Sequence, residues 1–288
     1  MGFTPAFVPS MDSLKRCRRL LRGWLAARLA AEEAEWLEGE AKAAKDGPEK
    51  RLFMAFSAAG RHASKAPLEL SEAERQAAEE ARPRWQPAGW TLEQAARTYL
   101  ALQRDSRDRA RWLREIAMLF EHADLGELVA LHQALPVLPN PDALADRCAE
   151  GIRSNMTDVF RAVAHRNPYP SENLSDSAWN QMVLKALFVE VGLADVVGLE
   201  ERANAALARA LCDFAKERWA AGRPVNPEVW LCVGPHADSE GVEALDRALT
   251  TGDEATKAAA TAALRRCPWP EASYVLSRHG LLRADDLL

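Results

Sequence analysis

The 288-residue sequence lacks the apolar segments that would place it in or across a membrane. No apolar run reaches the ~18 residues that a transmembrane helix needs. Near the N-terminus, the stretch LLRGWLAARLAA is interrupted by Arg22 and Arg28, so it does not form the uncharged core of a secretory signal. We therefore expect a cytoplasmic protein.

Cysteine is sparse and scattered. No CxxC pair occurs, and the five cysteines lie far apart, at Cys17, Cys148, Cys212, Cys232 and Cys267. An odd, dispersed set indicates reduced cysteines in the core of an intracellular protein, not a disulfide framework or a zinc site. An excess of basic residues is also lacking: the net charge is -5, so nothing favours nucleic acid as a partner.

Catalytic and cofactor motifs are missing as well. The sequence has no GxxxxGK[ST], no GxGxxG after a strand and no GxSxG, and none of its six histidines belongs to an HExxH motif. His236 and Asp238 form a PHAD loop that could hold a metal, but an aspartate that caps the next helix explains the loop more simply. We expect no metal and no cofactor.

The sequence is rich in helix-forming residues. Alanine, leucine, glutamate and arginine are abundant, and the alternation of β-branched residues typical of strands is missing. Segments with proline or glycine and polar residues interrupt the helical patterns at 45–50, 81–90, 135–141, 166–170, 221–227 and 267–270. This pattern predicts an all-α protein.

A stacked arrangement of helix pairs is suggested by the C-terminal part. Residues 241–267 predict two short helices around a Gly-Asp turn, and the small residues Ala259, Ala260 and Ala263 resemble the inner helix of a HEAT-type repeat. We expect a HEAT-like α-α superhelix of stacked antiparallel helix pairs. It would form a single domain over 1–288, in which N-terminal helices from 1–90 pack on the helical-repeat array of 91–288, and 11–45 would form one long helix.

The N-terminal helix combines an apolar face with a basic one. Lys15, Arg16, Arg18, Arg19 and Arg22 fill the face opposite the leucines. A basic amphipathic helix can lie on an anionic membrane surface. The simpler interpretation is a first helix with a solvated basic face. Membrane-surface contact through the Lys15–Arg22 helix, peripheral at the inner membrane, stays open as an alternative.

A polar cluster stands out in the apolar stretch 151–193. The helix predicted from Trp179 onward is apolar on most sides but carries Asn180, Gln181 and Lys185. Buried amides and amines need partners, unless the stripe of Gln181 and Lys185 faces a wet cleft. Asp158 could pair with Lys185 if the two helices are neighbours. Candidate ligand- or partner-binding residues are Arg153, Asn155, Asp158, His165, Asn167, Tyr169, Trp179, Asn180, Gln181 and Lys185.

The same cluster has a structural interpretation. Asn167 can start the turn, Pro168 and Pro170 can stiffen it, and the Tyr169 hydroxyl can donate to a backbone carbonyl. A convergent polar pocket remains the functional interpretation. Its enzymatic form uses His165 as a general base, with Lys185 or Arg153 as its electrostatic partner. No catalytic residue is assigned.

One block of sequence resembles a known family. Arg153-Ser154-Asn155, Val159-Phe160 and Ala162 are followed by the Asn-Pro-Tyr-Pro turn at 167–170 and by WNQMVLKALF at 179–188. The arrangement resembles the EboA family of bacterial metabolite-traffic proteins, most firmly over residues 150 to 195.

The resemblance implies a role in bacterial secondary metabolism, including movement of the scytonemin precursor in cyanobacteria. It implies partners encoded in the same operon: a prenyltransferase-like membrane protein, a TatD-like hydrolase, a dehydroquinate-synthase-like enzyme and sugar-isomerase-like proteins. It supplies no catalytic residues. We therefore expect a non-enzymatic scaffold or adaptor, or a component that binds a small metabolite. The alternative is a small-molecule enzyme that uses the cluster at 153–185.

Overall fold

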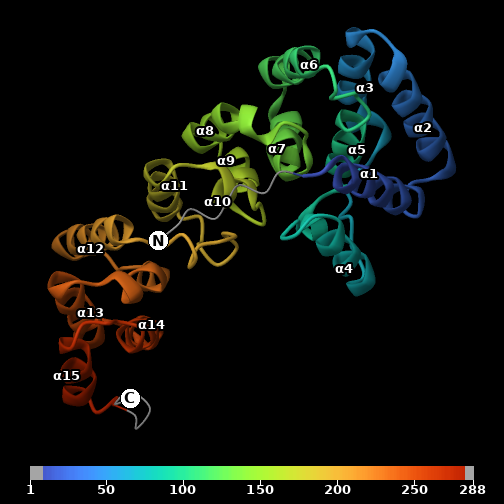
Figure 1. Cartoon of the computed structure of the whole chain (residues 1–288). Coiled ribbons are helices and arrows are strands. Elements are labelled where there is room, and N and C mark those ends of the chain that lie inside the picture. The colour runs from blue at the N-terminus through green and yellow to red at the C-terminus, as the bar shows by residue number, and fades with distance from the viewer. Residues whose placement is uncertain (1–8, 283–288) are drawn as a thin grey trace. The chain divides into compact units, whose positions relative to one another are not determined.

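Helices make up the regular structure of the chain. The computed structural model describes residues 9–282, and in that range the elements are α-helices and short 3-10 helices without a strand. An isolated β-bridge joins Pro67 and Thr91. The prediction of an all-α protein is confirmed, and Figure 1 shows the helices in chain order.

The chain divides into two compact units, Met1–Leu174 and Ser175–Leu288. The division falls after Leu174, and residues on both sides of the expected 90/91 boundary lie in the first unit. Arg82 shows this continuity, because its buried guanidinium forms an ion pair with Glu172, 90 positions later in the chain. A single domain over the whole chain stays a prediction.

The first unit contains ten α-helices among its described residues. They are α1 Met11–Ala26, α2 Ala31–Asp46, α3 Glu49–His62, α4 Glu72–Ala81, α5 Leu92–Ala101, α6 Arg109–His122, α7 Leu125–Ala134, α8 Ala145–Arg153, α9 Thr157–Ala164 and α10 Tyr169–Asn173. Three 3-10 helices accompany them: η1 Pro87–Gly89, η2 Leu135–Val137 and η3 Pro141–Ala143.

Helix α5 is central to the first unit. It packs against α1, α2, α3 and α7, and nine of its ten residues are buried. Its start is set locally, because Thr91 Oγ1 accepts from the Gln94 amide and the Gln94 side chain accepts from the Thr91 amide. Alanines allow its neighbours to approach closely, and Figure 1 shows α1, α2 and α3 beside it.

The expected long helix over 11–45 is wrong. The chain forms α1 and α2 instead, with a break at 27–30. A tertiary contact accounts for the break: the Arg28 guanidinium donates to the Glu74 carboxylate at 2.6 Å and to the Glu69 carbonyl at 3.0 Å. Glu33 then accepts from the Ala30 amide at the start of α2. Folding back makes α1 and α2 neighbours.

The second unit contains α11 Asp176–Phe188, α12 Ala205–Ala220, α13 Ser239–Thr251, α14 Glu254–Arg265 and α15 Glu271–Arg278, with the 3-10 helices η4 Pro227–Cys232 and η5 Gly234–His236. Helices α13 and α14 pack together around Gly252 and Asp253, which confirms the helix pair predicted at 241–267. Asp238 caps α13 by accepting from the Gly241 amide, as expected for the PHAD loop.

Candidate functional site

The predicted polar cluster is divided between the two units. Arg153 through Tyr169 belong to the first unit, and Trp179 through Lys185 belong to the second. Asp158 and Lys185 therefore lie in different units, and their pairing stays a prediction. Each half is described within its own unit.

Asn167 and Tyr169 hold the turn before α10 in place. Asn167 is 3% exposed, and its Nδ2 donates to the carbonyls of His132 and Ala162, each at 2.9 Å. Its Oδ1 accepts from the Tyr169 amide at 3.0 Å. The Tyr169 hydroxyl donates to the Pro141 carbonyl, and burial raises the pKa of this phenol. These contacts confirm the structural interpretation of the turn.

The other first-unit members of the cluster lie nearer the surface. Arg153, Asn155 and Asp158 are exposed, and His165 is half-buried at the end of α9. Arg153 lines a shallow hollow of about 320 Å³ together with Met156 and His132. His132 is buried, and burial lowers its pKa. It contacts the Leu128 and Arg147 carbonyls, which gives it a structural role.

In the second unit, Asn180 pairs with Asn204. Each side chain donates to the other, at 3.2 Å and 2.9 Å, and Asn204 Oδ1 also accepts from the Leu207 amide at the start of α12. Trp179 is fully buried beneath the Arg202 guanidinium, 5.2 Å from the ring centroid. Arg202 in turn donates to Asp176 at 2.8 Å.

Of the two alternatives for the polar stripe on α11, buried with partners or facing water, Gln181 fits the second. Gln181 is exposed, because the apolar face of α11 consists of Trp179, Met182, Val183, Ala186 and Leu187. Lys185 is half-buried, and burial lowers the pKa of its amine. Phe188 at the end of the helix is 65% exposed. The helix is thus amphipathic within its unit, although its sequence looks apolar on most sides.

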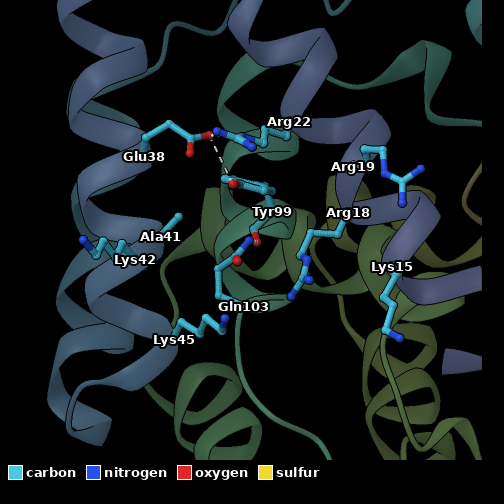
Figure 2. Close-up of a pocket in the computed structure, with 10 residues that line it drawn as sticks. All are labelled: Lys15, Arg18, Arg19, Arg22, Glu38, Ala41, Lys42, Lys45, Tyr99 and Gln103. Carbon is cyan, nitrogen blue, oxygen red and sulfur yellow. Dashed lines mark hydrogen bonds and ion pairs between the residues drawn. The ribbon is translucent and has the colours of Figure 1, made fainter. Parts of the chain in front are cut away.

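A basic cleft lies elsewhere, between α1, α2 and α5. It has a volume of about 410 Å³ and is lined by Lys15, Arg18, Arg19, Arg22, Glu38, Ala41, Lys42, Lys45, Tyr99 and Gln103. We call this set of residues the basic cleft, and Figure 2 shows it. The cleft is open to solvent along the exposed lysines and arginines, and the buried Tyr99 and Gln103 form its floor.

Helical periodicity places these side chains. On α1, the lining residues follow the spacing i, i+3, i+4 and i+7 from Lys15 to Arg22. On α2, the lining residues follow the same spacing from Glu38 to Lys45. Such residues share one face of a helix, so each helix presents one wall. Figure 2 shows Arg18 and Lys45 directed from opposite walls toward Gln103, whereas the Lys42 amine points away from the interior.

Glu38 organises one end of the cleft. Its Oε1 accepts from Arg22 Nε at 2.8 Å and from the Tyr99 hydroxyl at 3.2 Å. The hydrogen bond to Glu38 raises the pKa of Arg22. Burial, and then the charge and hydrogen bond of Glu38, raise the pKa of Tyr99 to about 12. Both donors therefore keep their protons at neutral pH.

The other cations of the cleft face little negative charge. Arg18, Arg19, Lys42 and Lys45 have no carboxylate within 4.0 Å among residues 9–282, and Lys15 reaches only the exposed Asp12, at 3.5 Å. Clustered like charges repel one another unless an anion neutralises them. Positive side chains are thus gathered in one cleft of a chain whose net charge is -5. The cleft is suited to binding an anion.

The apolar face of α1 is used inside the first unit. Leu21, Trp24 and Leu25 are buried, and the Trp24 ring lies 5.6 Å from that of Trp85. The basic face is the part of α1 that faces solvent. Membrane-surface contact through Lys15–Arg22 stays a prediction, and it would have to use this basic face.

Two features are absent from the residues that the structure describes. No helix between residues 9 and 282 is both long and apolar enough to cross a membrane. In the same residues, no group of three or more histidine, cysteine, aspartate or glutamate side chains is arranged to hold a metal ion.

Comparison with known proteins identifies the family. The model of the family described as metabolite traffic protein EboA matches residues 17–234, which is more than half of the 288-residue chain. The chain belongs to the EboA family. No curated protein and no solved structure matches it.

The EboA match is wider than the stretch around 150–195 on which the sequence resemblance rests. It includes every residue of the basic cleft except Lys15. Helices α13, α14 and α15 follow its end at residue 234. The sequence had marked the basic face of α1 but not the cleft, because the contribution of α2 depends on the chain folding back at 27–30.

Proposed function

We propose that this member of the EboA family acts in metabolite traffic by binding an anionic metabolite in the basic cleft, without converting it. The family description supports a role in traffic. The observation that carries the proposal is the basic cleft itself, where α1 and α2 hold cations on facing walls with a single carboxylate, Glu38, between them.

The chemistry of the lining supports binding. Arginine presents a planar fork of donors that matches oxyanions, and lysine adds a mobile point charge. Arg18 comes from α1 and Lys45 from α2, so an anion between them would contact both walls. Hydrogen bonds between charged groups contribute about 1.5–3 kcal/mol each, less where water competes. A few such contacts give a reversible complex, as a traffic protein requires.

We also propose that the protein contacts partner proteins and that its helix pairs form a HEAT-like stack. A protein that carries a metabolite has to receive it and pass it on, so we expect it to contact the proteins encoded with it. Helices α13 and α14 form a packed pair, and pairs of this kind offer extended surfaces when they are stacked. The cytoplasm, with its access to the inner membrane, is the compartment that we propose.

The binding proposal is tested by isothermal titration calorimetry of the full chain with inorganic pyrophosphate. We expect Arg18→Gln and Lys45→Gln each to weaken binding about tenfold, which corresponds to the loss of about 1.4 kcal/mol. Arg16→Gln is the matched control, because Arg16 is exposed on the same helix and does not line the cleft. Equal affinities in all three variants would contradict the proposal.

A second experiment tests the cellular ligand. The chain is purified from its native host, and the small molecules released on denaturation are identified by mass spectrometry. We expect an anionic compound with the wild-type chain and its loss with the Arg18→Gln, Lys45→Gln double variant. An identical set of compounds from both proteins would argue against the cleft.

A further inference from the structure

A second hollow adjoins the basic cleft. It has a volume of about 460 Å³ and shares Lys15, Arg18, Lys45 and Gln103 with the cleft. The two cavities therefore meet at the place where Arg18 and Lys45 are directed toward Gln103. A molecule held at this junction can extend into both.

The adjoining hollow has an apolar side that the cleft lacks. Met11, Leu14, Leu102 and Pro139 contribute to its lining. Leu102 and Pro139 are buried, whereas Met11 is 51% exposed at the rim. Methionine adapts its shape to irregular apolar groups because it is unbranched and flexible. This side offers contact area to a hydrocarbon chain or ring.

Arg104 provides an independent observation in the same hollow. Its side chain lines the hollow but is only 6% exposed. Nη1 donates to the Ala44 and Gly47 carbonyls, and Nε lies 2.8 Å from the Glu115 carboxylate. Nε and Nη2 are buried, and neither makes a hydrogen bond within residues 9–282. A buried donor without a hydrogen bond is costly, and the charge of the nearby Glu115 carboxylate offsets part of this cost.

The junction fits a phosphate better than a carboxylate. A single arginine satisfies a planar carboxylate, whereas a phosphate carries oxygens in several directions and accepts from donors on opposite sides. Here Arg18 and Lys45 come from opposite walls and Gln103 lies between them. Donors therefore lie on more than one side of the junction, as a tetrahedral group requires.

We infer that the ligand is an amphiphilic phosphate ester, whose phosphate lies among Arg18, Lys45 and Gln103 and whose apolar part lies in the adjoining hollow against Met11 and Leu14. The inference rests on the proposed function and names its class of ligand. A free metabolite and a lipid headgroup share this chemistry.

Calorimetry with two probes, inorganic phosphate and butyl phosphate, tests the inference on the full chain. We expect the butyl group to tighten binding about tenfold, because part of the chain leaves water. Met11→Ser should reduce this gain to about threefold. Met54→Ser is the matched control, since Met54 is 50% exposed and lies outside both cavities. Arg18→Gln should weaken both probes about tenfold.

The outcomes separate the two proposals. If butyl phosphate binds no more tightly than phosphate, or if Met11→Ser keeps the full gain, the inference is overturned while anion binding stands. If neither probe depends on Arg18, the proposed function itself fails. Flotation with vesicles of phosphatidylcholine, with and without phosphatidic acid, shows whether the bound phosphate belongs to a lipid headgroup or to a soluble metabolite. Flotation that needs phosphatidic acid and Arg18 assigns the phosphate to a lipid, and its absence assigns it to a soluble ester.

Discussion

Asn180 and Asn204 form a reciprocal pair, in which each side-chain amide donates to the carbonyl oxygen of the other. The pair joins α11 to the residue that caps α12. One of the amides that made α11 look like a binding helix is thus engaged within the second unit. Because Asn204 satisfies its amide, the polarity of Asn180 does not indicate a ligand-binding site.

Asn180→Ala is expected to lower the free energy of unfolding by about 1–2 kcal/mol, because Asn204 loses its partner. Gln181→Ala, at the exposed next position, should change it by less than about 0.5 kcal/mol. Urea unfolding followed by circular dichroism measures both. Similar losses in the two variants would show that the pair contributes little.

Tyr169→Phe removes the hydroxyl that donates to the Pro141 carbonyl in the core of the first unit. We expect a loss of about 1–2 kcal/mol, since the carbonyl is left without this donor. Tyr274→Phe is the matched control, because Tyr274 is 68% exposed. The melting temperature of each variant is compared with that of the wild type. An unchanged value for Tyr169→Phe would contradict the prediction.

Glu172→Gln leaves the Arg82 guanidinium, which is 1% exposed, without its carboxylate. Arg82 keeps its contacts with the Pro136 and Pro83 carbonyls, so we expect a loss of about 2–3 kcal/mol instead of unfolding. Glu150→Gln alters an exposed pair with Arg147 and should cost little. Chemical denaturation compares them, and equal costs would argue against a buried pair.

The Arg28–Glu74 pair predicts a pH dependence. Hydrogen bonds from Arg28, aided by the Ser71 amide, lower the pKa of Glu74 from its ordinary value of 4.5 to about 2. A lowered carboxyl pKa stabilises the folded chain fully above pH 4.5, and this contribution is lost as the pH falls through about 2. Solvent screens the partly exposed pair, so the contribution is about 1–2 kcal/mol.

The measurement is the difference in unfolding free energy between the wild type and Glu74→Gln, taken from pH 7 to pH 2. We expect this difference to shrink below pH 4.5. Glu72→Gln, beside it on α4 and 85% exposed, is the control. A difference that stays constant with pH would refute the assignment to Glu74.

Glu38→Gln should strengthen anion binding in the basic cleft. It removes the only carboxylate of the lining and releases Arg22, so we expect the affinity for pyrophosphate to rise about threefold to tenfold. The pKa of Tyr99 should also fall below about 12, because the charge of Glu38 helps to raise it. Calorimetry and ultraviolet titration follow the two effects. Weaker binding in Glu38→Gln would contradict this prediction and would mean that the carboxylate holds Arg22 and Tyr99 in place for the anion.

The sequence by itself determined the local features of this protein. Helix starts at Thr91 and Ser175 follow from side chains that cap the next few amides, and the Asn167–Tyr169 turn follows from an asparagine that precedes a Pro-Tyr-Pro sequence. These contacts join residues two or three positions apart, so the amino-acid sequence alone predicts them. The family resemblance over 150–195 also comes from the amino-acid sequence alone, and the family match over 17–234 confirms it.

Only the tertiary structure decided which surfaces meet. The break between α1 and α2 depends on Arg28 reaching Glu74, which lies 46 positions later. That fold-back brings the basic face of α1 opposite Lys45, with Tyr99 of α5 beneath. Gln181 is exposed for a similar reason, since packing selects one apolar face of α11. Periodicity tells which residues share a face of a helix, but long-range packing decides what that face contacts.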